Sequence, residues 1–173
     1  MGITLLVCLL LRGFNLVRPL AAPAASMSPA IDPGDYLIME GASYLWRDPV
    51  RGELAVFRTK GLLPLDQLFV KRVAGLPGER VKISDGVLLV NGEPASIENM
   101  LGLIEYRYPP GSDSSAMIGE GVEVTVPDGH YFVVGDNSTN SNDSRFWGFV
   151  PRDQIIGRII TCYWPPERSG RVK

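Results

Sequence analysis

The sequence predicts a mainly β fold of antiparallel sheets, with one short apolar helix at the N-terminus. The chain has 173 residues, of which 45% are apolar, and this is enough for one domain with a sizeable core. Its 19 glycines and 14 prolines are spread along the chain, which favours many turns between short strands. Only the first residues form a longer apolar run, so a helix is expected there alone.

The N-terminal run, residues 2–11, is apolar and uncharged, and Arg12 separates it from a second apolar stretch. A membrane-spanning helix needs about 20 mostly apolar residues, so the helix can span only if it continues past Arg12. We interpret residues 1–20 as a membrane anchor with a connecting segment, and residues 21–173 as a β-rich domain. A cleaved secretory signal and a buried core helix are the alternatives.

Eight strands are expected after the anchor, because short apolar runs alternate there with turn residues. They cover residues 36–39, 54–57, 68–73, 80–83, 87–90, 122–126, 131–134 and 155–163. Residues 91–128 are expected to be a peripheral loop or hairpin insertion, because their polar centre lacks clear periodicity.

Charge and cysteine content exclude several classes of function. The 17 basic and 19 acidic residues give a net charge of -2, which is unlike the basic surface of a nucleic-acid-binding protein. The two cysteines, Cys8 and Cys162, are not expected to form a disulfide, because Cys8 lies in the apolar run. No cluster of cysteine and histidine has the spacing of metal ligands, so we expect no metal and no other cofactor.

A serine and a lysine in separate short motifs are the candidate catalytic pair. Ser26 lies three residues before a proline, and Lys71 lies within the expected strand 68–73. A serine hydroxyl is a weak nucleophile until a base takes its proton, and the single histidine, His130, lies at a turn before a strand and is given no catalytic role. Taken alone, Ser26 would be an ordinary turn residue and Lys71 a solvated edge residue.

Lysine can serve as the base if burial lowers its pKa towards neutrality. Strand alternation places Phe69 and Val73 on the same face as Lys71, so the amine would lie between two apolar neighbours. A free lysine has a pKa of about 10.4, so the pKa must fall by roughly 3 units for the amine to be mostly neutral at pH 7–8.

A third motif spans residues 129–151, where a short strand leads into a loop rich in Asn, Ser and Asp. Together with the first two motifs, it makes the chain resemble bacterial signal peptidase I, a family of membrane-bound serine proteases. Four parts of the sequence carry the resemblance in the order of the family, namely residues 26–29, 34–38, 51–57 with 71–79, and 135–148.

The resemblance implies a signal-peptidase-like β fold and a serine endopeptidase that removes signal peptides from exported preproteins. Ser26 would be the nucleophile and Lys71 the general base. Ser141 would orient the lysine, and the remaining supporting residues would be Asp143, Arg145 and Arg72. Since a nearby carboxylate raises the pKa of a lysine, we expect Asp136 and Asp143 to be held by arginines or loop amides. Without the resemblance, Asp143 and Arg145 could be a surface ion pair worth about 0–1 kcal/mol.

Signal peptides have small residues before the cleavage site, which suit shallow apolar pockets. By the resemblance, these pockets would be lined by Met27, Ile31, Leu37, Val56, Phe69 and Val70. The implied partners are preprotein signal peptides and the lipid bilayer. The implied location is the bacterial inner membrane, with a single span and an extracytoplasmic catalytic domain. Arg12 and Arg18 follow the apolar run and by the positive-inside tendency favour the opposite orientation.

One position departs from the family pattern. Many members have a serine two residues before the nucleophile, whose hydroxyl helps to hold the oxyanion, but here this residue is Ala24. The oxyanion hole would then depend mainly on the backbone amide of Ser26. Three alternatives stay open: another Ser/Lys enzyme such as a self-cleaving repressor domain, a peptidase specialised for one substrate such as a pilin, and an inactive membrane-tethered domain that binds peptides.

Overall fold

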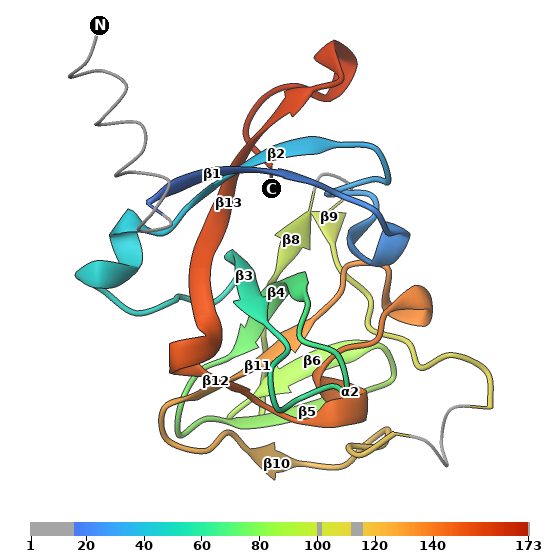
Figure 1. The fold of residues 1–173 in the computed structure, drawn as a ribbon. Coiled ribbons are helices and arrows are strands. Elements are labelled where there is room, and N and C mark those ends of the chain that lie inside the picture. Colours follow the sequence, from blue (N-terminus) through green and yellow to red (C-terminus); the bar gives the residue numbers. More distant parts are fainter. Residues whose placement is uncertain (1–15, 100–101, 112–115, 173) are drawn as a thin grey trace, which may run out of the picture.

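The computed structural model describes residues 16–99, 102–111 and 116–172. Within these ranges the chain is mainly β, and every pairing between the named strands is antiparallel, which confirms the predicted fold class (Figure 1). The N-terminal apolar run and Cys8 lie outside the described residues. None of the helices in the described ranges is long and apolar enough to cross a membrane.

The strands form three sheets. The largest has seven strands in the order β1-β2-β13-β3-β4-β11-β12, the second has four in the order β10-β5-β6-β7, and β8 pairs with β9. The strands are β1 (Val17–Ala21), β2 (Tyr36–Glu40), β3 (Leu54–Arg58), β4 (Leu68–Gly75), β5 (Arg80–Ser84), β6 (Val87–Val90), β7 (Glu93–Pro94), β8 (Glu98–Asn99), β9 (Gly102–Leu103), β10 (Val124–Thr125), β11 (His130–Val134), β12 (Val150–Pro151) and β13 (Ile155–Trp164).

The described ranges also contain six short helical turns, of which five lie between strands and one follows β13. They are η1 (Ala25–Met27), η2 (Ala42–Leu45), η3 (Ser138–Asn140), α2 (Ser144–Trp147), η4 (Arg152–Gln154) and η5 (Pro166–Arg168). The side chain of Asp143 caps α2 by accepting a hydrogen bond from the backbone N–H of Arg145. Three of these turns, η1, η3 and α2, lie at or next to the candidate site.

The segment before the candidate nucleophile is a strand, although the sequence indicated only a connecting segment up to residue 20. β1 pairs with β2 along its whole length, from Val17 opposite Glu40 to Ala21 opposite Tyr36. The backbone N–H of Ala22 then donates to the carbonyl of Asp35, and the chain turns into η1. The large sheet therefore fixes the start of the turn that carries Ser26.

The insertion 91–128 is only partly peripheral. It contains the antiparallel pair β8–β9, but Ile97, Tyr106, Ile118 and Val126 are buried in a core cluster with residues of β4, β5, β6 and β11. Its strands have two residues each, so the buried side chains do not recur with a helix or strand period. The sequence pattern therefore did not reveal that this segment closes part of the core.

Candidate active site

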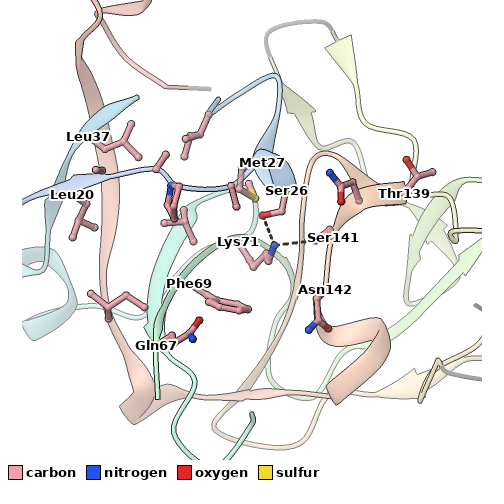
Figure 2. A pocket seen from close by; sticks show the side chains of 18 residues that line it. Leu20, Ser26, Met27, Leu37, Gln67, Phe69, Lys71, Thr139, Ser141 and Asn142 are labelled. Atoms are coloured by element: carbon pink, nitrogen blue, oxygen red, sulfur yellow. Dashed lines mark hydrogen bonds between the residues drawn. The ribbon is translucent and has the colours of Figure 1, made fainter. Parts of the chain in front are cut away.

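Three elements bring the two candidate catalytic residues and Ser141 together. Ser26 lies in η1, Lys71 in the centre of β4, and Ser141 directly after η3. Lys71 Nζ lies 2.7 Å from Ser26 Oγ and 3.0 Å from Ser141 Oγ (Figure 2). The sequence separations are large, so only the folded sheet can assemble this group.

Burial changes the acidity of the Lys71 amine. The residue is 3% exposed, and desolvation lowers its pKa from an ordinary 10.5 to about 8, because burial penalises the charged form. The charges of Asp143 and Asp136 act in the opposite direction, while Arg145 adds to the lowering. The amine also lies 5.8 Å from the centre of the Phe69 ring, the apolar neighbour expected on its face of the strand. A large fraction of Lys71 is therefore neutral near pH 8.

Asp136 forms a buried ion pair with Arg72. The Nε and Nη2 atoms of Arg72 donate to the two carboxylate oxygens at 2.7 and 2.6 Å, and Nη1 donates to the carbonyl of Gly52 at 2.8 Å. Because Arg72 follows Lys71 in β4, its side chain lies on the opposite face of the strand. The arginine therefore holds this carboxylate and ties β4 to the turn before β3.

Asp143 and Arg145 form a second pair, and both side chains are fully buried. Arg145 Nε and Nη2 each donate to a carboxylate oxygen of Asp143 at 2.8 Å, and the backbone N–H of Gly135 donates to the same carboxylate at 2.9 Å. The surface ion pair considered from the sequence is therefore excluded. Both carboxylates near the lysine have the partners that we expected.

Gly135 allows the end of β11 to pass close to the two serines. A Cβ atom at this position would overlap the Ser141 hydroxyl and the carbonyl oxygen of Ser26. Any larger residue would have to displace both atoms, and the second of them belongs to the backbone. This glycine, the first residue of the Gly-Asp-Asn motif at residues 135–137, is therefore required by the close approach of η1 to the loop 135–142.

Comparisons with known proteins show which family the chain belongs to. The chain matches the family model for signal peptidase, peptidase S26, over residues 1–164. The chain belongs to the signal peptidase family. It is 37% identical to probable signal peptidase I-1 of Synechocystis sp., over 98% of this chain and 82% of the relative. It is 35% identical to signal peptidase I of Leptolyngbya laminosa, over 99% of this chain and 80% of the relative.

A solved signal peptidase I from Enterococcus faecalis V583 is 28% identical, with a TM-score of 0.47, over 65% of this chain and 97% of that chain. The family model and the relatives confirm the resemblance expected from the motifs. The chain is therefore a serine peptidase.

A cavity of about 620 Å³ opens beside the Lys71 amine of the peptidase. Its walls come from the end of β1 and the segment that follows it, from β2, from the start of β4, and from η3 and the loop after it (Figure 2). Five of the six side chains expected in the substrate pockets line it, namely Met27, Ile31, Leu37, Phe69 and Val70.

Val56 is the exception among the expected pocket residues. It is fully buried in β3, where it pairs with Val70 and packs with Leu54 and Met39 in the core. The resemblance alone did not distinguish a residue of the core from one at the cavity wall. Lining residues that the sequence did not indicate come mainly from the ends of β1 and η3, and they are Leu20, Ala21, Ala22, Pro23, Gln67, Leu68, Thr139, Asn140 and Asn142.

Asn137 is a further residue of the site that the sequence did not indicate. Its backbone N–H donates to the carbonyl of Ser26 at 3.1 Å, and its Nδ2 atom donates to the carbonyl of Ala25 at 3.1 Å. The Gly-Asp-Asn motif was the available signal, but it did not indicate which partners the amide would have.

Within the described residues, no group of three or more His, Cys, Asp and Glu side chains could hold a metal ion.

The insertion also supports the loop that carries Ser141. Ser138 Oγ donates to the carbonyl of Glu105 and accepts from the backbone N–H of Arg107, at 3.0 and 2.9 Å. Arg145 Nη1 donates to the carbonyl of Arg107 at 2.8 Å. The part of the chain outside the family motifs therefore braces one wall of the site.

Proposed function

We propose that this peptidase removes signal peptides from exported preproteins at a membrane surface, with Ser26 as nucleophile and Lys71 as general base. The observation that carries the proposal is the 2.7 Å contact between Ser26 Oγ and a buried lysine amine whose pKa is about 8. Nucleophile and base at this distance, with a third group orienting the base, are the arrangement that activates a serine hydroxyl.

The first step is acylation. Neutral Lys71 takes the hydroxyl proton of Ser26, and Oγ attacks the scissile carbonyl carbon of the preprotein. The backbone N–H of Ser26 stabilises the resulting oxyanion. Lys71 then gives the proton to the nitrogen of the leaving amine, the C–N bond breaks, and the signal peptide is left as an ester on Ser26.

Deacylation repeats these steps with water. Lys71, neutral again, takes a proton from a water molecule that attacks the ester carbon, and then returns a proton to Ser26 Oγ as the ester bond breaks.

Ser141 accepts a hydrogen bond from the Lys71 amine, at 3.0 Å, and so keeps the lone pair of the neutral amine directed at Ser26. Asp143 and Asp136 are neutralised by their arginines, so they raise the pKa of the amine less than free carboxylates would.

The cavity beside Lys71 fits the substrate class. Its lining includes Leu20, Met27, Ile31, Leu37 and Val70, which offer apolar contacts to the small side chains that precede a signal-peptide cleavage site. A polar or bulky side chain would lose solvation or overlap these walls. We therefore infer that the cavity receives the residues just before the scissile bond.

The N-terminal apolar sequence supports action at the membrane. β1 begins directly after this stretch and leads through the cavity wall to Ser26, so an anchor would hold the site near the bilayer. In our proposal the peptidase has a single span in the bacterial inner membrane, with the catalytic domain on the extracytoplasmic side, where exported preproteins emerge.

The proposal is tested by incubating the detergent-solubilised full chain with a preprotein and identifying the cleaved bond by mass spectrometry. We expect cleavage after small residues at the end of the signal peptide, and its loss in Ser26→Ala. Ser84→Ala is the matched control, because this serine lies in β5, outside the cavity lining, and should leave cleavage intact. Cleavage that survives Ser26→Ala would reject the assigned nucleophile.

A further inference from the structure

We propose that Asn137 is a positioning residue that fixes and polarises the oxyanion-binding peptide group of this peptidase. The proposal rests on the function proposed above, in which Ser26 is the nucleophile and its backbone N–H stabilises the oxyanion. It assigns a role to the side-chain amide of Asn137, which contacts neither the Ser26 hydroxyl nor the Lys71 amine in the structure but the backbone that carries the nucleophile.

The key observation is that one peptide group connects Asn137 to the proposed oxyanion site. The carbonyl of Ala25 and the N–H of Ser26 belong to the same planar unit, and in a trans peptide they point in opposite directions. Asn137 Nδ2 donates to the Ala25 carbonyl at 3.1 Å. The amide therefore holds one end of the unit whose other end is the proposed oxyanion donor.

The next peptide group is held from the same residue. The backbone N–H of Asn137 donates to the carbonyl of Ser26 at 3.1 Å. Asn137 thus binds the carbonyl on each side of the Ser26 N–H and fixes the rotation of both peptide planes. The backbone N–H of Ser28 also donates to the Ala25 carbonyl, at 3.1 Å, so this carbonyl accepts two hydrogen bonds.

Hydrogen bonds to a carbonyl polarise the whole peptide group and make its N–H a stronger donor. This matters here because Ala24 has no hydroxyl that could supply a second donor. Removing one donor from an oxyanion hole costs about 10²–10³ in rate, so weakening and misorienting the remaining donor should cost a part of that, roughly 10–100-fold. The loss should appear in the transition state and not in binding of the ground state.

The test compares two ligands on the purified full chain. A peptide aldehyde with small residues before the carbonyl forms a tetrahedral adduct with Ser26 and places an oxygen at the oxyanion site, whereas the corresponding peptide alcohol cannot. In Asn137→Leu, which has a similar shape but no donor, we expect the inhibition constant of the aldehyde to rise about 10–100-fold. That of the alcohol should change less than about threefold, and the midpoint of the pH–rate profile should stay near 8.

Asn137→Ala is the second variant, for the case that the leucine does not fit. The inhibition constant of the aldehyde should again rise much more than that of the alcohol. The control is Gln154→Ala, a half-buried amide in η4 outside the cavity lining, which should leave both constants unchanged. An equal change for both ligands, or an unchanged aldehyde constant, would overturn the role of Asn137. Failure of the proposed function would instead appear as cleavage that survives Ser26→Ala in the otherwise unaltered chain, so the two failures are distinguishable.

Discussion

Replacing Lys71 by arginine is expected to reduce kcat/KM for preprotein cleavage by roughly 10²–10⁴-fold, the typical contribution of a general base. Arginine keeps a positive charge and hydrogen-bond donors, but its guanidinium is not deprotonated in proteins and cannot accept the Ser26 proton. The measurement is the initial rate of cleavage at pH 8 with substrate well below KM.

Two further variants serve as controls for this prediction. Lys71→Met keeps much of the length and apolar character of the side chain but has no charge and cannot accept a proton. It should lose activity to a similar extent, because the loss in Lys71→Arg comes from the missing base and not from the size of the guanidinium. Lys60→Arg makes the same substitution at an exposed lysine and should retain the rate of the unaltered chain. If Lys71→Arg kept more than about a tenth of the rate, Lys71 would not be the base.

Arg145→Met is expected to lower the free energy of unfolding by about 3–5 kcal/mol, because it leaves the fully buried Asp143 carboxylate without its charged partner. It also removes the hydrogen bonds from Arg145 to the carbonyls of Arg107 and Ser138, which tie the insertion to the site loop. Denaturant-induced unfolding, followed by tryptophan fluorescence, measures the loss.

The same substitution should raise the pKa of Lys71. Arg145 lowers this pKa and Asp143 raises it, so removing the arginine leaves only the opposing charge of that pair. The pH–rate midpoint is therefore expected above 8 in any folded Arg145→Met. Arg80→Met is the matched control, because Arg80 pairs with Glu123 at the exposed surface, where such pairs contribute about 0–1 kcal/mol. A loss no larger than that of the control, or a midpoint that moves down, would contradict the assigned role of the buried pair.

The regular strands could be predicted from the sequence because their signals are local. The expected strand 54–57 became β3 and the expected strand 68–73 became β4, since each is a short apolar run between turn residues. The same local reasoning did not find β1, where Val17, Pro19 and Ala21 are exposed and only Arg18 and Leu20 are half-buried. Pairing with β2, not the local pattern, makes this segment a strand.

The residues of the site likewise include some that could be predicted from the sequence and some that could not. Ser26, Lys71 and Ser141 could be proposed because the motifs around them, taken together, resemble signal peptidase I. The partners of Asn137 and the burial of Val56 could not, since they depend on which strands and turns meet in three dimensions. Ile97 and Tyr106 were missed for the same reason, because they lie in a segment without periodicity and are buried by distant parts of the chain.

The most direct test of the mechanism is a titration of the Lys71 amine. NMR of the full chain with labelled lysine side chains, from about pH 6 to about pH 10.5, would follow Lys71 after assignment with Lys71→Met. We expect a pKa of about 8, and kcat/KM should rise about tenfold per pH unit below that value and level off above it, because only the neutral amine can take the Ser26 proton. An amine that stays charged to about pH 10, in a peptidase that is fully active at pH 8, would contradict the Ser26/Lys71 mechanism.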